Sequence, residues 1–213
     1  MSVEPFSLAH SLKESTMKAH HKAEQSQFMK QLFQGKCSNQ SYLIYLWALK
    51  EIYQTLEAEM EDLKDHDYIQ KIYLPQLFRL RSLEEDLAQW GFDENTEIPP
   101  QVRQAVDNYC SRLKNLAKSA PYLLTAHAYV RYLGDLSGGQ MLGKVLPKNF
   151  QRETGFAFYD FSHLDAQEAK TDYRRRLDEL GGRSEEKAKG ICEEAIHSFV
   201  LNSQLFSSLD SVN

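Results

Sequence analysis

Two adjacent histidines, His20 and His21, are the residues of this sequence best suited to hold a metal. A neutral imidazole is the commonest protein ligand for a transition metal. On a helix, His20 lies four residues before Glu24, so this carboxylate could orient the imidazole ring of His20. His21 would point about 100° away around the helix axis. A histidine on a helix is more often a polar surface residue or a hydrogen-bonded core residue, and this alternative remains open.

A second candidate is Asp135, an acid placed among glycines. Residues 122–145 have apolar side chains three or four apart and lie between Pro121 and Pro147, which predicts one long helix. The second half of this segment holds four glycines: Gly134, Gly138, Gly139 and Gly143. Each glycine inside a helix costs about 1 kcal/mol relative to alanine. A kink, or a flat group lying against a backbone without Cβ atoms, would offset this cost.

Two other interpretations of the glycines apply. Their four-residue spacing also suits close packing of one helix on another through small residues. Gly138, Gly143 and Lys144 fit part of a phosphate-binding GxxxxGK loop. Val145 stands where that loop needs Ser or Thr, and the preceding pattern is helical, so a nucleotide site is disfavoured. Helix packing remains the main alternative.

A di-iron carboxylate centre is another possibility for a helical protein, and it requires two Glu-x-x-His motifs and two further glutamates. Only Glu194 with His197 has this spacing, so we expect these two residues to form a solvated pair at a helix edge. His127 shares a helix face with Arg131 and is predicted to be structural.

Three basic residues, Lys13, Lys170 and Arg174, belong to predicted helices near opposite ends of the chain. Beside a pocket they would suit a ligand that carries carboxylates. The alternative is that they form a solvated helix face.

The composition is that of one globular domain covering residues 1–213, with 42% apolar residues and a mean hydropathy of −0.55. Because no apolar run reaches about 18 residues, we expect neither a membrane span nor a membrane anchor. The N-terminus, which carries Glu4, lacks the basic region and apolar core of a secretory signal, so we expect a cytoplasmic protein.

Three cysteines at wide spacing argue against a disulfide framework and fit a reducing compartment. The net charge of −5 argues against broad nucleic-acid binding.

Helical periodicity runs through the whole sequence, and no long alternating strand pattern appears. We therefore expect an all-α, single-domain bundle of about eight helices. Ser38, Asp165 and Ser184 are expected to begin helices, and Ser82 with Glu85 resembles a capping box for another.

Three segments carry a family resemblance. The sequence LLTAHAYVRYLGDLSGGQ, residues 123–140, is similar to the signature of the haem oxygenases. LKESTMKAHHKAE, residues 12–24, resembles that family's proximal segment, and FVLNSQLF, residues 199–206, resembles its last helix. The resemblance spans almost the whole chain. It implies a soluble, bacterial-type fold that holds haem between an N-terminal helix and a kinked, glycine-rich distal helix.

The resemblance implies a role for each matching residue. His20 matches the iron ligand, Glu24 matches the residue that orients it, and His21 is expected to be exposed and uninvolved. Asp135 matches the carboxylate that holds distal waters. The glycines expected to lie against the porphyrin are Gly134, Gly138 and Gly139.

Other matches belong to supporting sets. The residues expected in the distal polar network are Tyr53, Tyr109, Arg131 and Asn202. The residues expected at the haem propionates are Lys13, Tyr129, Lys170 and Arg174, and Phe199 is a further expected haem contact. Val130 departs from the family, because many members have Thr at this position.

The implied activity is that of an oxidoreductase that opens haem at a meso carbon to give biliverdin, carbon monoxide and ferrous iron. Haem would be both substrate and cofactor, with dioxygen as oxidant and electrons from a reductase, ferredoxin or flavodoxin type of donor. The alternative function is a haem-binding or haem-storage protein without turnover.

Overall fold

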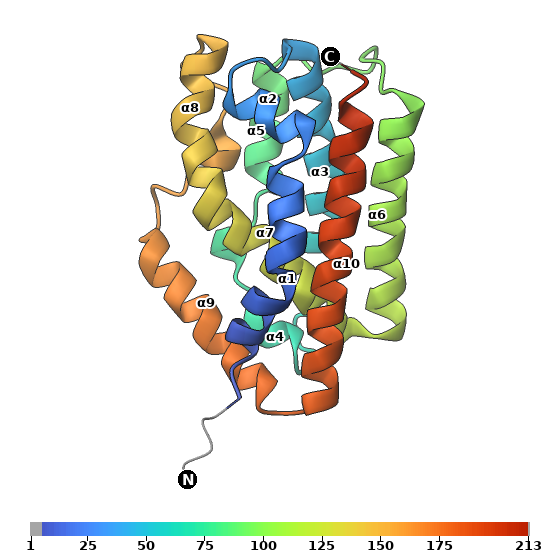
Figure 1. The fold of residues 1–213 in the computed structure, drawn as a ribbon, viewed down its shortest axis with the longest axis vertical. Coiled ribbons are helices and arrows are strands. Elements are labelled where there is room, and N and C mark those ends of the chain that lie inside the picture. The colour runs from blue at the N-terminus through green and yellow to red at the C-terminus, as the bar shows by residue number, and fades with distance from the viewer. Residues whose placement is uncertain (1–5, 213) are drawn as a thin grey trace.

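The computed structural model describes residues 6–212, which form a bundle of helices (Figure 1). Residues 1–5 and 213 lie outside the described part, and with them Glu4, one basis of the expectation about a secretory signal. The α-helices are α1 Leu8–Glu24, α2 Gln27–Phe33, α3 Asn39–Asp62, α4 Ile69–Ile72, α5 Leu80–Gln89, α6 Pro100–Ser119, α7 Leu124–Gly134, α8 Gln140–Phe150, α9 Ala166–Gly181 and α10 Glu185–Leu209. The expected all-α class is confirmed.

Short segments of other helical type connect these elements. The 3₁₀ turns are η1 Pro75–Leu77, η2 Pro121–Leu123 and η4 Ala157–Tyr159, and the π-helical turn is η3 Asp135–Gly139. Helices α1 and α2 are separate because Ser26 caps α2 by accepting the N–H of Met29. The glycine-rich helix is likewise divided by η3 into α7 and α8.

The core lies around α3, whose central residues are almost all buried. Helix α3 packs against α6 and α5, and α10 packs along α1, α7 and α6. Figure 1 shows α1 beside α10, with α6 beyond α10 and α9 on the other side of α1. No helix in the range 6–212 combines the length and the apolarity needed to cross a bilayer.

Local capping signals are confirmed at three helices. The side chains of Ser38, Asp165 and Ser184 accept backbone N–H groups at the start of α3, α9 and α10. The prediction for Ser82 is wrong, because α5 begins at Leu80. Its first N–H groups are instead bound by Glu57 of α3, whose carboxylate accepts from Arg79 at 2.6 Å and from Leu80 at 3.2 Å. A cap supplied from another helix leaves no local pattern in the sequence.

The glycine-rich helix ends later than its sequence indicates. Pro147 lies inside α8, which continues to Phe150. Proline lacks an N–H, so the usual bond to the carbonyl four residues earlier, that of Gly143, cannot form. The helix nevertheless continues for three residues beyond the proline, and its C-cap residue, Gln151, has a left-handed backbone conformation (φ 52°).

Candidate functional site

The four glycines of the central segment divide into two faces. A Cβ atom added at Gly143 would lie 2.9 Å from the Cβ of Tyr159, and one added at Gly139 would lie 3.7 Å from the Tyr159 ring. Among the described residues, a Cβ added at Gly134 or Gly138 would meet no atom within 4 Å apart from its chain neighbours and the backbone of its own helix. Close packing therefore explains Gly143, whereas Gly134 and Gly138 are exposed and adjoin open space.

The kink expected in this segment is the π-helical turn Asp135–Gly139. A π-helical turn carries one extra residue relative to an α-helical turn, and such turns are frequent at functional sites. Asp135 is the first residue of the turn and is buried, with 9% of its surface exposed. The turn therefore begins with a buried acid that directly follows Gly134, one of the two glycines next to open space.

Within residues 6–212, the Asp135 carboxylate has one direct hydrogen-bond partner, Tyr53 of α3. The Tyr53 hydroxyl donates to Oδ2 of Asp135 at 2.5 Å. Burial raises the pKa of Asp135 to about 6, and this effect outweighs the Tyr53 hydrogen bond and the charges of Arg131 and Arg79, which lower the pKa. A carboxyl group with this pKa can hold or release a proton close to neutral pH.

The predicted distal residues lie together around Arg131. Its Nη2 atom donates to Oδ1 of Asn202 at 2.5 Å. Its guanidinium carbon lies 5.0 Å from the centre of the Tyr109 ring and 5.6 Å from that of Tyr53. Four helices, α3, α6, α7 and α10, together with η3, which supplies Asp135, thus form one buried polar cluster.

Sequence reasoning missed a buried network beside this cluster. His127 is fully buried, and its ring nitrogens contact the Tyr109 hydroxyl at 3.2 Å and the Glu194 carboxylate at 2.9 Å. The expectation that Glu194 lies at a solvated edge is wrong: only 5% of it is exposed, and Arg112 also donates to it. These partners lie 67 and 82 residues away along the chain, so the Glu-x-x-His spacing carried no information about them.

His20 lies on α1 with half of its side chain exposed. Its Nδ1 atom faces Oε2 of Glu24 at 3.4 Å, which leaves Nε2 on the opposite side of the ring. Phe199 of α10 packs against the ring edge to face, with 5.6 Å between ring centres. His21 is exposed, as expected, although its Nδ1 atom also lies 3.7 Å from Oε2 of Glu24.

The basic residues lie on α1 and α9, which pack against each other. Tyr129 of α7 is affected by a residue of each helix: burial raises the pKa of its hydroxyl, and a side-chain hydrogen bond with Thr16 and the charge of Arg174 lower it. Lys13 and Arg174 are exposed and Lys170 is partly exposed, so their charges can reach a ligand. The charge of Arg174 therefore acts on Tyr129, and Lys13 and Lys170 lie on the same pair of helices as Arg174.

These residues fit a bound haem. A flat porphyrin can approach the backbone at Gly134 and Gly138 because no side chain fills the space there. The Nε2 atom of His20 can serve as an iron ligand while Glu24 orients the ring through Nδ1. Exposed basic side chains on α1 and α9 suit the carboxylates of the propionates.

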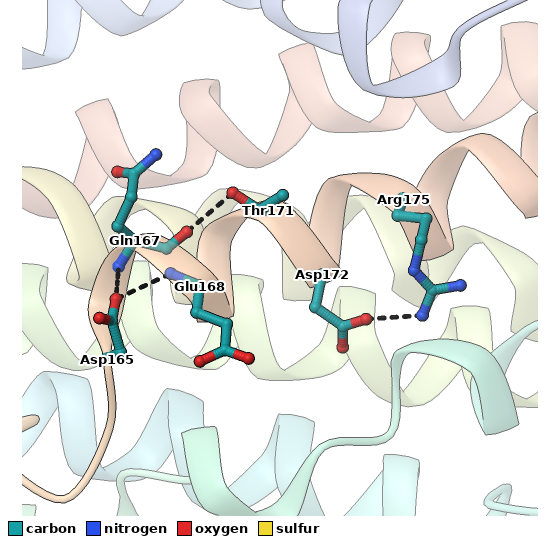
Figure 2. A pocket seen from close by; sticks show the side chains of 6 residues that line it. All are labelled: Asp165, Gln167, Glu168, Thr171, Asp172 and Arg175. Atoms are coloured by element: carbon teal, nitrogen blue, oxygen red, sulfur yellow. Dashed lines mark hydrogen bonds and ion pairs between the residues drawn. The ribbon is translucent and has the colours of Figure 1, made fainter.

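Figure 2 shows a separate surface hollow at the start of α9. Its lining residues are Asp165, Gln167, Glu168, Thr171, Asp172 and Arg175. Asp165 caps the helix and Asp172 pairs with Arg175, so these polar groups serve the helix itself. None of the predicted site residues lines this hollow.

Comparisons with known proteins agree with a site that fits haem. The family model described as Heme oxygenase matches residues 6–208. Heme oxygenase 1 of Synechocystis sp. is 37% identical over 205 residues, which is 95% of this chain and 85% of that protein. Heme oxygenase 2 of Rattus norvegicus is 38% identical over 208 residues, but the chain spans only 65% of its length.

Solved structures show the same fold. The crystal structure of heme oxygenase-1 from Synechocystis in complex with heme has a TM-score of 0.90 at 35% identity, and the match covers 97% of this chain and 94% of that chain. Heme oxygenase from Leptospira interrogans has a TM-score of 0.85 at 36% identity, and the match covers 95% and 99%. The chain belongs to the heme oxygenase family.

Proposed function

We propose that this protein opens haem at a meso carbon to give biliverdin, carbon monoxide and ferrous iron, using dioxygen and electrons from a separate donor protein. Bound haem supplies the iron at which dioxygen is activated and is also the molecule consumed. The observation that supports this proposal best is the buried Asp135–Tyr53 pair, in which the acid directly follows Gly134, one of the two glycines next to open space. A protein that only stores haem has no need of a buried acid at this position.

On the distal side, the role of Asp135 is to hold a proton and to order water next to the reacting face. Tyr53 fixes one carboxylate oxygen by donating to it, which leaves Oδ1 for water. Arg131 holds Asn202 and keeps a positive charge near the acid. The backbone at Gly134 and Gly138 would approach a bound porphyrin directly, because no Cβ atom stands between them, and would limit the space on that face.

On the proximal side, His20 is the proposed iron ligand and Glu24 its orienting partner. Phe199 limits rotation of the imidazole by packing against its edge. Lys13, Tyr129, Lys170 and Arg174 are the proposed propionate partners. Charge-assisted hydrogen bonds from these residues to two carboxylates would orient a bound haem and so determine which meso carbon is opened.

The function is tested by mixing purified protein with one equivalent of haem and adding ascorbate, or a reductase with its electron source, in air. We expect loss of the haem absorption and formation of a green bilin, identified by chromatography. The same mixture without oxygen is the control and should keep its haem. Stable haem in air with a competent reductant would favour a binding or storage function instead.

A further inference from the structure

Asp86 of α5 is an acid in the core that contacts neither the proximal nor the distal residues. Only 1% of its surface is exposed. Its Oδ1 accepts the N–H of Ala157 at 2.7 Å and its Oδ2 accepts the N–H of Phe158 at 2.8 Å. A buried carboxylate is costly unless it is fully hydrogen-bonded. Here both oxygens bind one short turn, η4, and an amide side chain would offer only one oxygen for the two N–H groups.

The two residues of η4 that follow Ala157 face the distal site. The Phe158 ring meets the Tyr53 ring edge to face, with 5.5 Å between centres. The Tyr159 side chain lies against Gly143 and Gly139, where added Cβ atoms would approach it to 2.9 and 3.7 Å. One side chain therefore supports the donor to Asp135, and the next supports the end of the π-helical turn.

The far end of the same loop is also held. Arg79, only 4% exposed, donates from Nη1 to the carbonyl oxygen of Asp160 at 2.9 Å. Its guanidinium carbon lies 4.1 Å above the ring of Phe161. With Asp86 at the start and Arg79 at the end, the loop has little freedom to withdraw from Tyr53 and Gly143.

We propose that Asp86 is a positioning residue for haem degradation: by holding η4 it presses Phe158 onto Tyr53 and Tyr159 onto the glycine helix, and so fixes the hydroxyl that binds Asp135. The inference rests on the proposed function for the role of Asp135, but the packing it describes exists in the haem-free protein. If η4 becomes mobile, Phe158 no longer packs against the Tyr53 ring. The Tyr53 hydroxyl then no longer keeps its hydrogen bond to the Asp135 carboxylate.

The first test uses the haem-free protein and the variant Asp86→Asn, which keeps the side-chain volume and removes one acceptor oxygen. NMR should show a slowly exchanging Tyr53 hydroxyl proton in the wild type and its loss in the variant. Amide exchange at residues 135–139 should become about tenfold faster, while exchange in α6 stays unchanged. Glu84→Gln, an exposed change on the same helix, is the matched control and should behave as wild type.

The second test uses the haem-loaded protein. For Asp86→Asn we expect a haem dissociation constant within about twofold of wild type and a turnover lowered at least about fivefold, because binding and proton control depend on different residues. If this variant does not fold, Phe158→Leu tests the contact between η4 and Tyr53 by changing the η4 residue. It should likewise keep its haem affinity and lose turnover. Retention of the hydroxyl proton and of slow exchange in the variant that folds would overturn the proposal, and so would a parallel loss of binding and turnover. Failure of the wild type to open haem would count against the proposed function and leave the NMR result standing.

Discussion

His20 and His21 differ in what surrounds them rather than in residue type. His20 has Phe199 against its ring and the closer approach to Glu24, at 3.4 Å, whereas His21 lies 3.7 Å from Glu24 and is the more exposed of the two. We expect His20→Ala to fold and to lose the nitrogen-ligated haem spectrum, and His21→Ala to keep it. Absorption and resonance Raman spectra of the two haem complexes test this expectation. The assignment would shift by one residue if His21→Ala, and not His20→Ala, removed the ligand.

Asp135 is the residue on which proton control should depend. Asp135→Ala leaves Tyr53 without its acceptor and removes the group that orders water, so we expect haem binding to persist and haem opening to slow by about 10²-fold or more. Asp135→Asn keeps a polar group for water and should retain part of the activity. Turnover measured alongside haem affinity separates the two effects. Wild-type turnover in Asp135→Ala would show that another group controls the proton.

The start of α5 gives a prediction about pH. Burial raises the pKa of Glu57 from 4.5 to about 7, and its bonds to Arg79 and Leu80 only partly oppose this. Because the folded state holds the proton more tightly than the unfolded chain, the stability contributed by Glu57 is fully present below about pH 4.5. It is lost as the pH rises through about 7.

Replacing Glu57 with Gln removes this titration. We expect the fall in unfolding free energy between pH 4.5 and pH 8 to be smaller in Glu57→Gln than in wild type, by an amount on the order of 3 kcal/mol. Urea unfolding at both pH values measures the difference. Glu84→Gln is exposed on the neighbouring helix and should leave the pH dependence as in wild type. If the unfolding free energy fell equally in wild type and Glu57→Gln between the two pH values, Glu57 would not titrate in this range.

The elements also show which features the sequence could predict. Ser38 and Ser184 lie beside the N–H groups that they cap, so their signals are local and the predicted helix starts are correct. The Glu57 cap and the burial of Glu194 depend on residues from other helices, and no local spacing reveals them. The residues of the distal site were predicted through family resemblance. The position of the turn η4, which packs against these residues, was not predicted. It depends on Asp86, which lies 71 residues away from Ala157 in the chain.

At the scale of the molecule, the proposed haem site joins α1 to the glycine-rich segment. A ligand that binds only the folded state stabilises it, by about 2.7 kcal/mol when its free concentration is 100 times the dissociation constant. We therefore expect the melting temperature to rise with haem concentration in wild type and much less in His20→Ala. Thermal unfolding at several haem concentrations measures this. A melting temperature independent of haem would contradict a site between these elements.

Because the glycines lie on two different faces, variants selected for folding and variants selected for haem turnover should differ at these positions. Gly143 has no room for a Cβ beside Tyr159, whereas Gly134 and Gly138 have room. A library of variants sorted only for folding should discard alanine at 143 and accept, or even enrich, alanine at 134 and 138, because alanine favours a helix by about 1 kcal/mol. The same library sorted for haem turnover should discard all three. The two positions at which these sortings disagree would locate the haem surface without any structure of a complex.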